Sequence, residues 1–100
     1  MRESKLEEKF RAMVARAGGK AYKFISPGNA GAPDRLVVLP GGQVGFVELK
    51  QQGGKPRRLQ ELRMAELRRM GCFTAVVDSE GSAREAIKAL QGFRPQGGTQ

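Results

Sequence analysis

Two carboxylates and a lysine interrupt a largely apolar stretch, "GAPDRLVVLPGGQVGFVELK", which runs from Gly31 to Lys50. Asp34 stands at the start of one apolar run, and Glu48 and Lys50 close the next. If the two runs pair as a hairpin, the start of the first lies beside the end of the second. Carboxylates that close repel each other unless a positive charge separates them, and Mg²⁺ prefers oxygen ligands. The pattern therefore predicts a site for a divalent cation.

Each of these residues also has a purely structural interpretation. Asp34 can cap a turn, while Glu48 and Lys50 can form a surface ion pair. In a strand, however, residues two apart share a face, so Glu48 and Lys50 point the same way. Val44 and Phe46 precede them on that face and are expected to be core. The strand is thus predicted to end in a polar site.

The composition limits the chemistry that remains available. The chain has no histidine, which excludes His-based triads, His general bases and His metal ligands. Cys72 is the single cysteine, so an intrachain disulfide is excluded and a reduced structural thiol is expected. Catalysis would have to rely on carboxylates, amines, hydroxyls or a metal held by oxygen.

Length and charge indicate the class of partner. One hundred residues make one domain, and the formal net charge of +8 attracts polyanions, of which nucleic acid is the commonest. No apolar run approaches the roughly 18–20 residues of a membrane span, and the charged N-terminus does not resemble a signal peptide. We expect a soluble, cytoplasmic protein without membrane contact.

Periodicity and capping residues predict three helices that position these groups. The first runs from the cap Ser4 to Gly18, the second from Arg57 to Met70 with Pro56 in its first turn, and the third from a Ser82–Glu85 capping box to about Leu90. The apolar stripe of the first helix consists of Leu6, Phe10, Met13, Val14 and Ala17.

Strands are predicted at residues 20–26, at the hairpin 35–40 and 44–50, and at the nearly all-apolar run 72–78, which suits a strand buried on both faces. The order α-β-β-β-α-β-α predicts an α/β sandwich with a mixed central sheet flanked by helices. Residues 1–91 are expected to form the domain, and residues 92–100 a flexible C-terminal tail.

A family resemblance covers most of the chain, from about Glu3 to Asp78. Pro33-Asp34 followed by Glu48-Leu49-Lys50 resembles the PD-(D/E)xK nuclease motif. With "GxPDR" at residues 31–35, "ELK" at 48–50, a glutamate on the first helix and Gln60 downstream, the chain resembles a stand-alone virus-type replication-repair nuclease (VRR-NUC) domain. The resemblance implies a restriction-endonuclease-like fold.

The resemblance also implies a metal-dependent nuclease that hydrolyses phosphodiester bonds. In such enzymes Asp34 and Glu48 would hold Mg²⁺ or Mn²⁺ against the scissile phosphate, with the backbone carbonyl of Leu49 as a further oxygen ligand. Lys50 would orient or deprotonate the attacking water and stabilise the developing charge.

Which glutamate of the first helix joins the site depends on the helix phase. At about 100° per residue, Glu7 falls at the border of the apolar stripe and Glu8 on the opposite side. Ser4 and Glu7 are also spaced as a capping box, which is the structural alternative. The family pattern favours Glu7 as a catalytic residue, either as a metal ligand or as a group that positions water.

The remaining candidates are polar or basic residues expected to contact nucleic acid. Gln60 is either an active-site contact, as the resemblance implies, or a solvated helix residue. Arg35 is either a phosphate contact or a strand-edge charge. The cations that flank the site and are expected to hold backbone phosphates are Lys55, Arg57 and Arg58.

Two further expectations concern substrate and assembly. Stand-alone VRR-NUC domains resemble dimeric junction resolvases, which implies a homodimer that cuts branched DNA during phage or bacterial replication and repair. A replication helicase or another phage replication protein is a further expected partner. The alternative from another class is a non-catalytic basic DNA-binding module on a nuclease scaffold.

Overall fold

The chain alternates helices and strands in the predicted order. The computed structural model describes residues 4–95, and residues 1–3 and 96–100 lie outside the described part. The elements are α1 (Lys5–Arg16), β1 (Lys20–Lys23), β2 (Arg35–Leu39), β3 (Gln43–Leu49), α2 (Arg58–Arg69), β4 (Phe73–Val77) and α3 (Glu80–Gln91).

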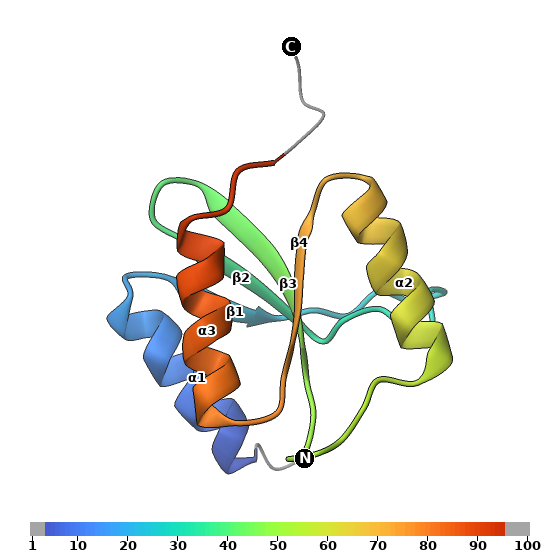
Figure 1. Ribbon diagram of the computed structural model, residues 1–100, viewed down its shortest axis with the longest axis horizontal. Coiled ribbons are helices and arrows are strands. Elements are labelled where there is room, and N and C mark those ends of the chain that lie inside the picture. The colour runs from blue at the N-terminus through green and yellow to red at the C-terminus, as the bar shows by residue number, and fades with distance from the viewer. Residues whose placement is uncertain (1–3, 96–100) are drawn as a thin grey trace.

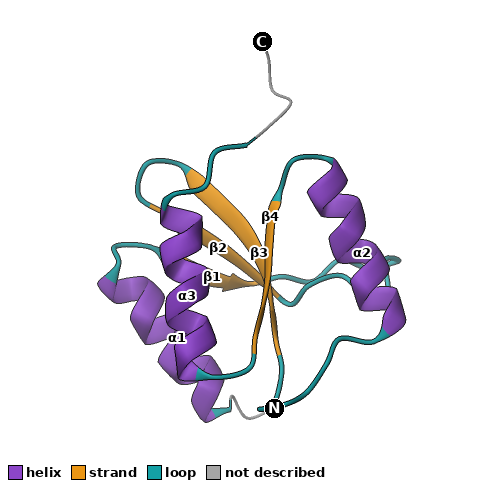
Figure 2. Ribbon diagram, in the orientation of Figure 1, coloured by secondary structure: helices purple, strands orange, loops and turns teal. Residues whose placement is uncertain are grey.

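The strands form one mixed sheet whose spatial order follows the sequence, β1-β2-β3-β4. β1–β2 and β2–β3 pair antiparallel, whereas β4 returns parallel to β3 after the α2 crossover. Helices α1 and α3 cover one face of the sheet and α2 covers the other, which makes three layers (Figures 1 and 2). The predicted α/β sandwich with a mixed sheet is confirmed.

The main core lies between the sheet and the pair α1 and α3. Phe10 and Val14 of α1 are fully buried, as the predicted apolar stripe requires. Gly45 of β3 lets α3 approach closely, because a Cβ there would lie 2.6 Å from the Phe73 ring and 3.2 Å from Leu90. The other buried members are Ala21, Val37, Leu39, Val47, Val77, Ala83, Ala86 and Ile87.

The α2 face of the sheet is less completely covered, and two predictions fail there. Val44 was expected in the core but is 44% exposed, and β4 is an edge strand whose Val76 is 37% exposed rather than a strand buried on both faces. A single helix covers this face, and of its own side chains only Met64 is buried. Phe46 is half-buried against Phe24, with ring centroids 5.5 Å apart.

Two helix starts also differ from the predictions. Pro56 precedes the N-cap Arg57 and therefore lies just outside α2 rather than in its first turn. α3 begins one turn earlier than predicted, because Ser79 rather than Ser82 is the N-cap and the Ser82 amide donates to its hydroxyl at 3.1 Å. Both serines are good N-caps, and in the structure Ser79, two residues after the end of β4, takes this role.

The end of the described chain folds back onto the domain. Phe93 packs against Phe73 with ring centroids 5.4 Å apart, and the Gln43 side chain donates to the Phe93 carbonyl at 3.0 Å. The rest of the expected tail, residues 96–100, lies outside the described residues, as does Glu3. Between residues 4 and 95, no helix is long and apolar enough to cross a membrane.

Candidate active site

The hairpin register brings Asp34 and Glu48 together. Arg35 pairs with Val47 across β2 and β3, and continuing that register by one residue sets Asp34 opposite Glu48. The Asp34 carboxylate accepts a hydrogen bond from the Leu49 amide at 3.2 Å. Two acidic residues distant in sequence thus meet at the carboxyl end of β3.

The two oxygens of Glu48 have different surroundings. Oε2 accepts from Gln60 Nε2 at 2.8 Å and forms an ion pair with Lys50 Nζ at 3.1 Å. Oε1 is buried and has no hydrogen-bond partner, although the residue is only 4% exposed. A buried carboxylate oxygen without a partner is costly. The side chain is held by Oε2, while Oε1 is a buried acceptor without a hydrogen-bond partner among the described residues.

The pKa of the Asp34 carboxyl is raised from 3.8 to about 6. The main cause is its burial, and the second is the negative charge of Glu48. The hydrogen bond from the Leu49 amide and the charge of Arg35 act in the opposite direction. The site therefore favours extra positive charge, in the form of a proton or a cation.

Glu7 reaches this end of the sheet from the α1 face. Its Oε1 accepts from the Ser4 amide at 2.7 Å, and the Ser4 hydroxyl accepts from the Glu7 amide at 3.1 Å, which is the capping box anticipated as the structural alternative. Its Oε2 lies 3.5 Å from Arg35 Nη2 and its charge contributes to the raised pKa of Asp34. Glu7 thus both caps α1 and lies near the site. Glu8, by contrast, is exposed.

Arg35 occupies a place that neither sequence interpretation described. Its side chain is 7% exposed, which leaves little of it accessible to a phosphate, and it is more than a strand-edge charge. It points to the α1 side of the sheet and pairs with Glu7, because strand alternation directs it opposite to Glu48. Its guanidinium lies beside Glu7 of α1, and its charge lowers the pKa of Asp34.

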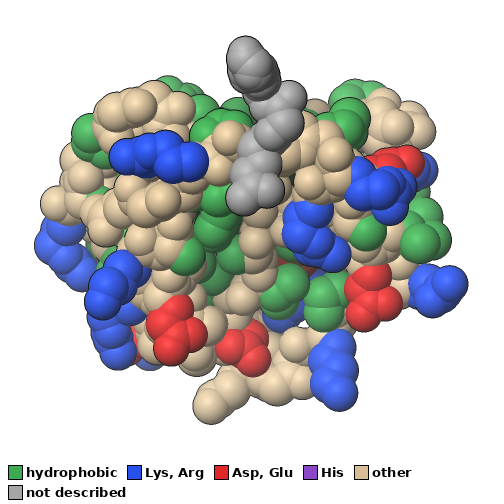
Figure 3. Space-filling model, turned by 45° about the horizontal axis from the view of Figure 1, so that its top comes forward, with side chains coloured by type: hydrophobic (Ala, Val, Ile, Leu, Met, Phe, Trp, Pro, Cys, Tyr) green, Lys and Arg blue, Asp and Glu red, His purple; other side chains and the backbone are tan. Residues whose placement is uncertain are grey.

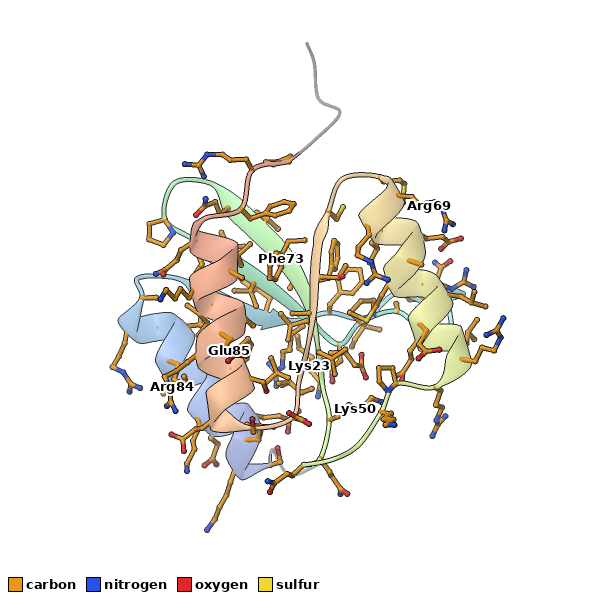
Figure 4. The ribbon with its side chains drawn as sticks, viewed as in Figure 1. Lys23, Lys50, Arg69, Phe73, Arg84 and Glu85 are labelled. Atoms are coloured by element: carbon orange, nitrogen blue, oxygen red, sulfur yellow. The ribbon has the colours of Figure 1, made fainter. Side chains whose placement is uncertain are left out.

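Gln60 reaches Glu48 from the opposite face of the sheet. Its Nε2 donates to Glu48, and its Oε1 accepts from the Arg57 amide at 2.9 Å, which ties the first turn of α2 to the end of β3. Lys55, Arg57 and Arg58 are exposed on the connector and on the start of this helix. Figure 4 shows Lys50 at the lower end of the sheet, on the side of α2.

A hollow of about 650 Å³ lies between the ends of β3 and β4 and the starts of α1 and α3, and Asp34, Glu48 and Gln60 are not among its lining residues. Its lining includes Glu7, Lys50 and Asp78. Sequence reasoning treated Asp78 only as the end of a strand. The signal that could have found it is the parallel pairing of β3 with β4, since ligands bind beyond the carboxyl ends of parallel strands.

The donor set fits a cation held by few side chains. Within residues 4–95, no three acidic, His or Cys side chains come close enough to form a metal site alone. Asp34 and Glu48 provide two carboxylates, one with a free buried oxygen. Hard cations such as Mg²⁺ are commonly bound through one or two carboxylates together with water and substrate phosphate.

Comparisons with known proteins relate the chain to nucleases. No protein-family model matches the chain. It is 45% identical over 80 residues to "Putative nuclease p44" of Acyrthosiphon pisum secondary endosymbiont phage 1, a match that covers 80% of this chain and 86% of the relative. A solved structure described as "VRR_NUC domain" superposes with a TM-score of 0.73 at 29% identity, covering 89% of this chain and 94% of that one. The chain belongs to the VRR-NUC family of nucleases.

Proposed function

We propose that the protein is a Mg²⁺- or Mn²⁺-dependent DNA endonuclease whose catalytic residues are Asp34, Glu48 and Lys50. The observation that carries this proposal is the unpartnered, buried Oε1 of Glu48 beside a carboxyl whose pKa is raised to about 6. A divalent cation would satisfy the first and neutralise the repulsion behind the second.

Asp34 and Glu48 would hold the cation, and the backbone carbonyl of Leu49 would assist. The Leu49 amide points to Asp34, and in a strand the carbonyl of a residue points to the same side as its amide. When bound, the cation withdraws charge from the phosphate and acidifies a water.

Lys50 and Gln60 would act on either side of Glu48. The Lys50 side chain is 20% exposed, so its ammonium can reach water or phosphate while staying 3.1 Å from Glu48. There it would orient the attacking water and stabilise the negative charge that develops. Gln60 would keep Glu48 in one rotamer, and Glu7 would support the site through Arg35 and Asp34.

A thermal melt with and without Mn²⁺ or Mg²⁺ tests the cation site without relying on activity. A ligand that binds only the folded state stabilises it by about 2.7 kcal/mol at one hundred times its Kd. We expect the wild-type melting temperature to rise with Mn²⁺ and the Glu48→Gln protein to show almost no rise. Equal melting with and without metal in the wild type would instead support a non-catalytic DNA-binding module.

Branched DNA is the substrate class that we favour, cut by a homodimer during phage or bacterial replication and repair. The net charge of +8 supports binding to a polyanion, and the exposed Lys55, Arg57 and Arg58 adjoin the site. The curated relative is a phage protein, which supports the expectation of a replication helicase or another phage replication protein as partner.

Exposed apolar side chains support self-association. Met70 is 71% exposed, Leu62 is 48% exposed and Val44 is 44% exposed, all on the side of the sheet that α2 covers incompletely. A two-fold dimer would bury such surface and present two sites, matching the symmetry of a four-way junction.

Light scattering of the pure protein, followed by cleavage of a matched panel of four-way junctions, flaps, nicked duplex and linear duplex in Mn²⁺, tests this part of the proposal. We expect a dimer that prefers junctions. A monomer that cuts linear duplex equally well would contradict the dimer and the junction preference, and would leave the metal-dependent nuclease intact.

A further inference from the structure

The connection between β1 and β2 carries Asp34, yet it is attached mainly to a helix. In Figure 1 this connection extends from the sheet toward α2. The Nε of Arg63, on the second turn of α2, donates to the Ala30 carbonyl at 3.0 Å. Gly31 lies directly on Leu59, in the first turn of the same helix.

Gly31 permits this contact for two separable reasons. Its φ of +87° is in the left-handed region, and a Cβ on it would lie 2.8 Å from the Leu59 side chain and 3.0 Å from the Leu59 carbonyl group. Gly28, in the same connection, has a similar φ of +80°, but a Cβ there would meet nothing within 4 Å. Only Gly31 is required by the close approach to the helix.

The first turn of α2 also contacts Glu48, the second carboxylate of the site. Gln60, adjacent to Leu59, donates to Glu48 at 2.8 Å. The first turns of α2 therefore contact the Asp34 loop through Leu59 and Arg63, and the Glu48 side chain through Gln60. Asp34 is attached to the loop through Pro33, which is among the most fully buried side chains.

Packing alone does not fix the loop on this side. A hollow of about 170 Å³ remains between the loop and α2, lined by Phe24, Asn29, Pro33, Phe46 and Arg63 among others. Because this hollow is large enough to admit water, side-chain packing between the loop and α2 is incomplete there, and the specific contacts of the loop matter more. Those contacts are the Arg63–Ala30 hydrogen bond and the Gly31–Leu59 approach.

We propose that Arg63 and Gly31 are positioning residues, which clamp the β1–β2 connection to α2 and thereby set the separation of the Asp34 and Glu48 carboxylates. The inference rests on the proposed function, in which these two carboxylates act together. Neither residue touches the reacting atoms. Each acts through the loop, so that α2 serves as a common frame for both halves of the site.

A readout that needs neither metal nor activity is the hydrogen exchange of the Leu49 amide, which donates to Asp34 at 3.2 Å. If the clamp holds Asp34 in place, releasing it breaks this bond more often. We expect Gly31→Ala and Arg63→Ala to speed this exchange on the order of tenfold.

Each variant has a matched control. Gly28→Ala introduces a side chain at a similar positive φ without touching α2, and Arg68→Ala removes another α2 arginine, one that donates to Thr74 at 2.9 Å instead of to the loop. Both controls should lose some stability and keep Leu49 exchange at the wild-type rate. Arg63→Lys, which retains a donor, should recover part of the protection that Arg63→Ala loses.

The second measurement is the Mn²⁺ midpoint from thermal shift, together with kcat and KM. We expect Gly31→Ala and Arg63→Ala to weaken Mn²⁺ binding about tenfold and to lower kcat more than they change KM, as loss of an outer support does. If Gly28→Ala matches Gly31→Ala in Leu49 exchange and Mn²⁺ midpoint, backbone strain explains both and the clamp is wrong. A wild type that Mn²⁺ does not stabilise contradicts the proposed function, while the exchange data still decide the clamp.

Discussion

The two ends of the sheet contain hollows of nearly equal volume that differ in how many charged residues line them. The one at the carboxyl end of β3 measures about 650 Å³ and includes Glu7, Lys50 and Asp78 in its lining. The one at the hairpin end measures about 680 Å³ and is lined by Val44, Phe46, several glycines and other neutral groups, with Arg94 as its only charged residue among those described. Figure 3, which brings this second end forward, shows hydrophobic side chains gathered between the helices.

The polar groups at the two ends are satisfied to different degrees. At the hairpin end, the Gln43 side chain donates to a carbonyl at 3.0 Å and Phe73 meets Phe93, so that the interactions serve packing. At the other end, a buried carboxylate oxygen of Glu48 has no partner, and the pKa of Asp34 is raised to about 6. Concavity therefore does not locate the candidate active site. The buried, unpartnered Glu48 oxygen and the raised pKa of Asp34 point to it, and neither residue lines the 650 Å³ hollow.

The largest expected effect comes from removing either carboxylate at the charged end. Asp34→Asn or Glu48→Gln should lower cleavage by more than the ~10–100-fold typical of residues that only support a metal ligand. The fold should persist, because the relief of repulsion between crowded acids offsets the loss of the Glu48–Lys50 ion pair in Glu48→Gln. Circular dichroism and a cleavage assay in Mn²⁺ on each variant test this. Near wild-type cleavage in either variant would remove that residue from the site.

Substituting each of two neighbouring glutamates on α1 should lower cleavage less, and the comparison tests which of them belongs to the site. Glu7→Gln weakens the contact with Arg35 and should lower cleavage about tenfold, in the range of an outer support. Glu8→Gln, on an exposed side chain one residue away, is the control and should change little. Equal losses of cleavage would mean that the role of Glu7 is confined to capping α1.

The pH dependence should reveal competition between protons and the cation at Asp34. Because the folded-state pKa is about 6 and the ordinary value 3.8, this group stabilises the metal-free fold below about pH 4, and that contribution is lost as the pH rises through about 6. Added Mn²⁺ should reverse the trend by favouring the ionised form. Cleavage should increase through about pH 6, with a midpoint that falls as Mn²⁺ is raised.

Melting curves from about pH 4 to pH 7, with and without Mn²⁺, measure this directly. Asp34→Asn has no titrating group at this position, so its melting temperature should lose this pH dependence. A cleavage midpoint that does not move with the Mn²⁺ concentration would indicate that the titrating group is not a metal ligand.

The smallest effect on cleavage is expected at the hairpin end. Phe93→Ala removes a partly buried ring from Phe73 and should cost up to about 3 kcal/mol, the low end of the range for Phe→Ala in a core. Cleavage per folded molecule and the Mn²⁺ midpoint should stay unchanged. Denaturant unfolding and cleavage at a temperature where the variant is fully folded test both. A parallel loss of Mn²⁺ affinity would show that the two ends are coupled.

Local sequence determined the elements and most of the site. The period of α1, the turn residues at Pro40–Gln43 and the alternation in β2 and β3 are short-range signals, so the hairpin and the meeting of Asp34 with Glu48 were predictable. The absence of histidine and the pairing of carboxylates with Lys50 already indicated oxygen-based metal chemistry.

Tertiary structure alone decided what surrounds those residues. A run such as 72–78 is equally apolar in a central strand and in an edge strand, so the exposure of Val76 depends on the sheet order and not on local pattern. The burial of Arg35 against Glu7 depends on α1 lying on this face of the sheet, and the unpartnered Oε1 of Glu48 depends on where Gln60 and Lys50 reach. Burial and partner choice are set by segments far apart in the chain, which local periodicity does not encode.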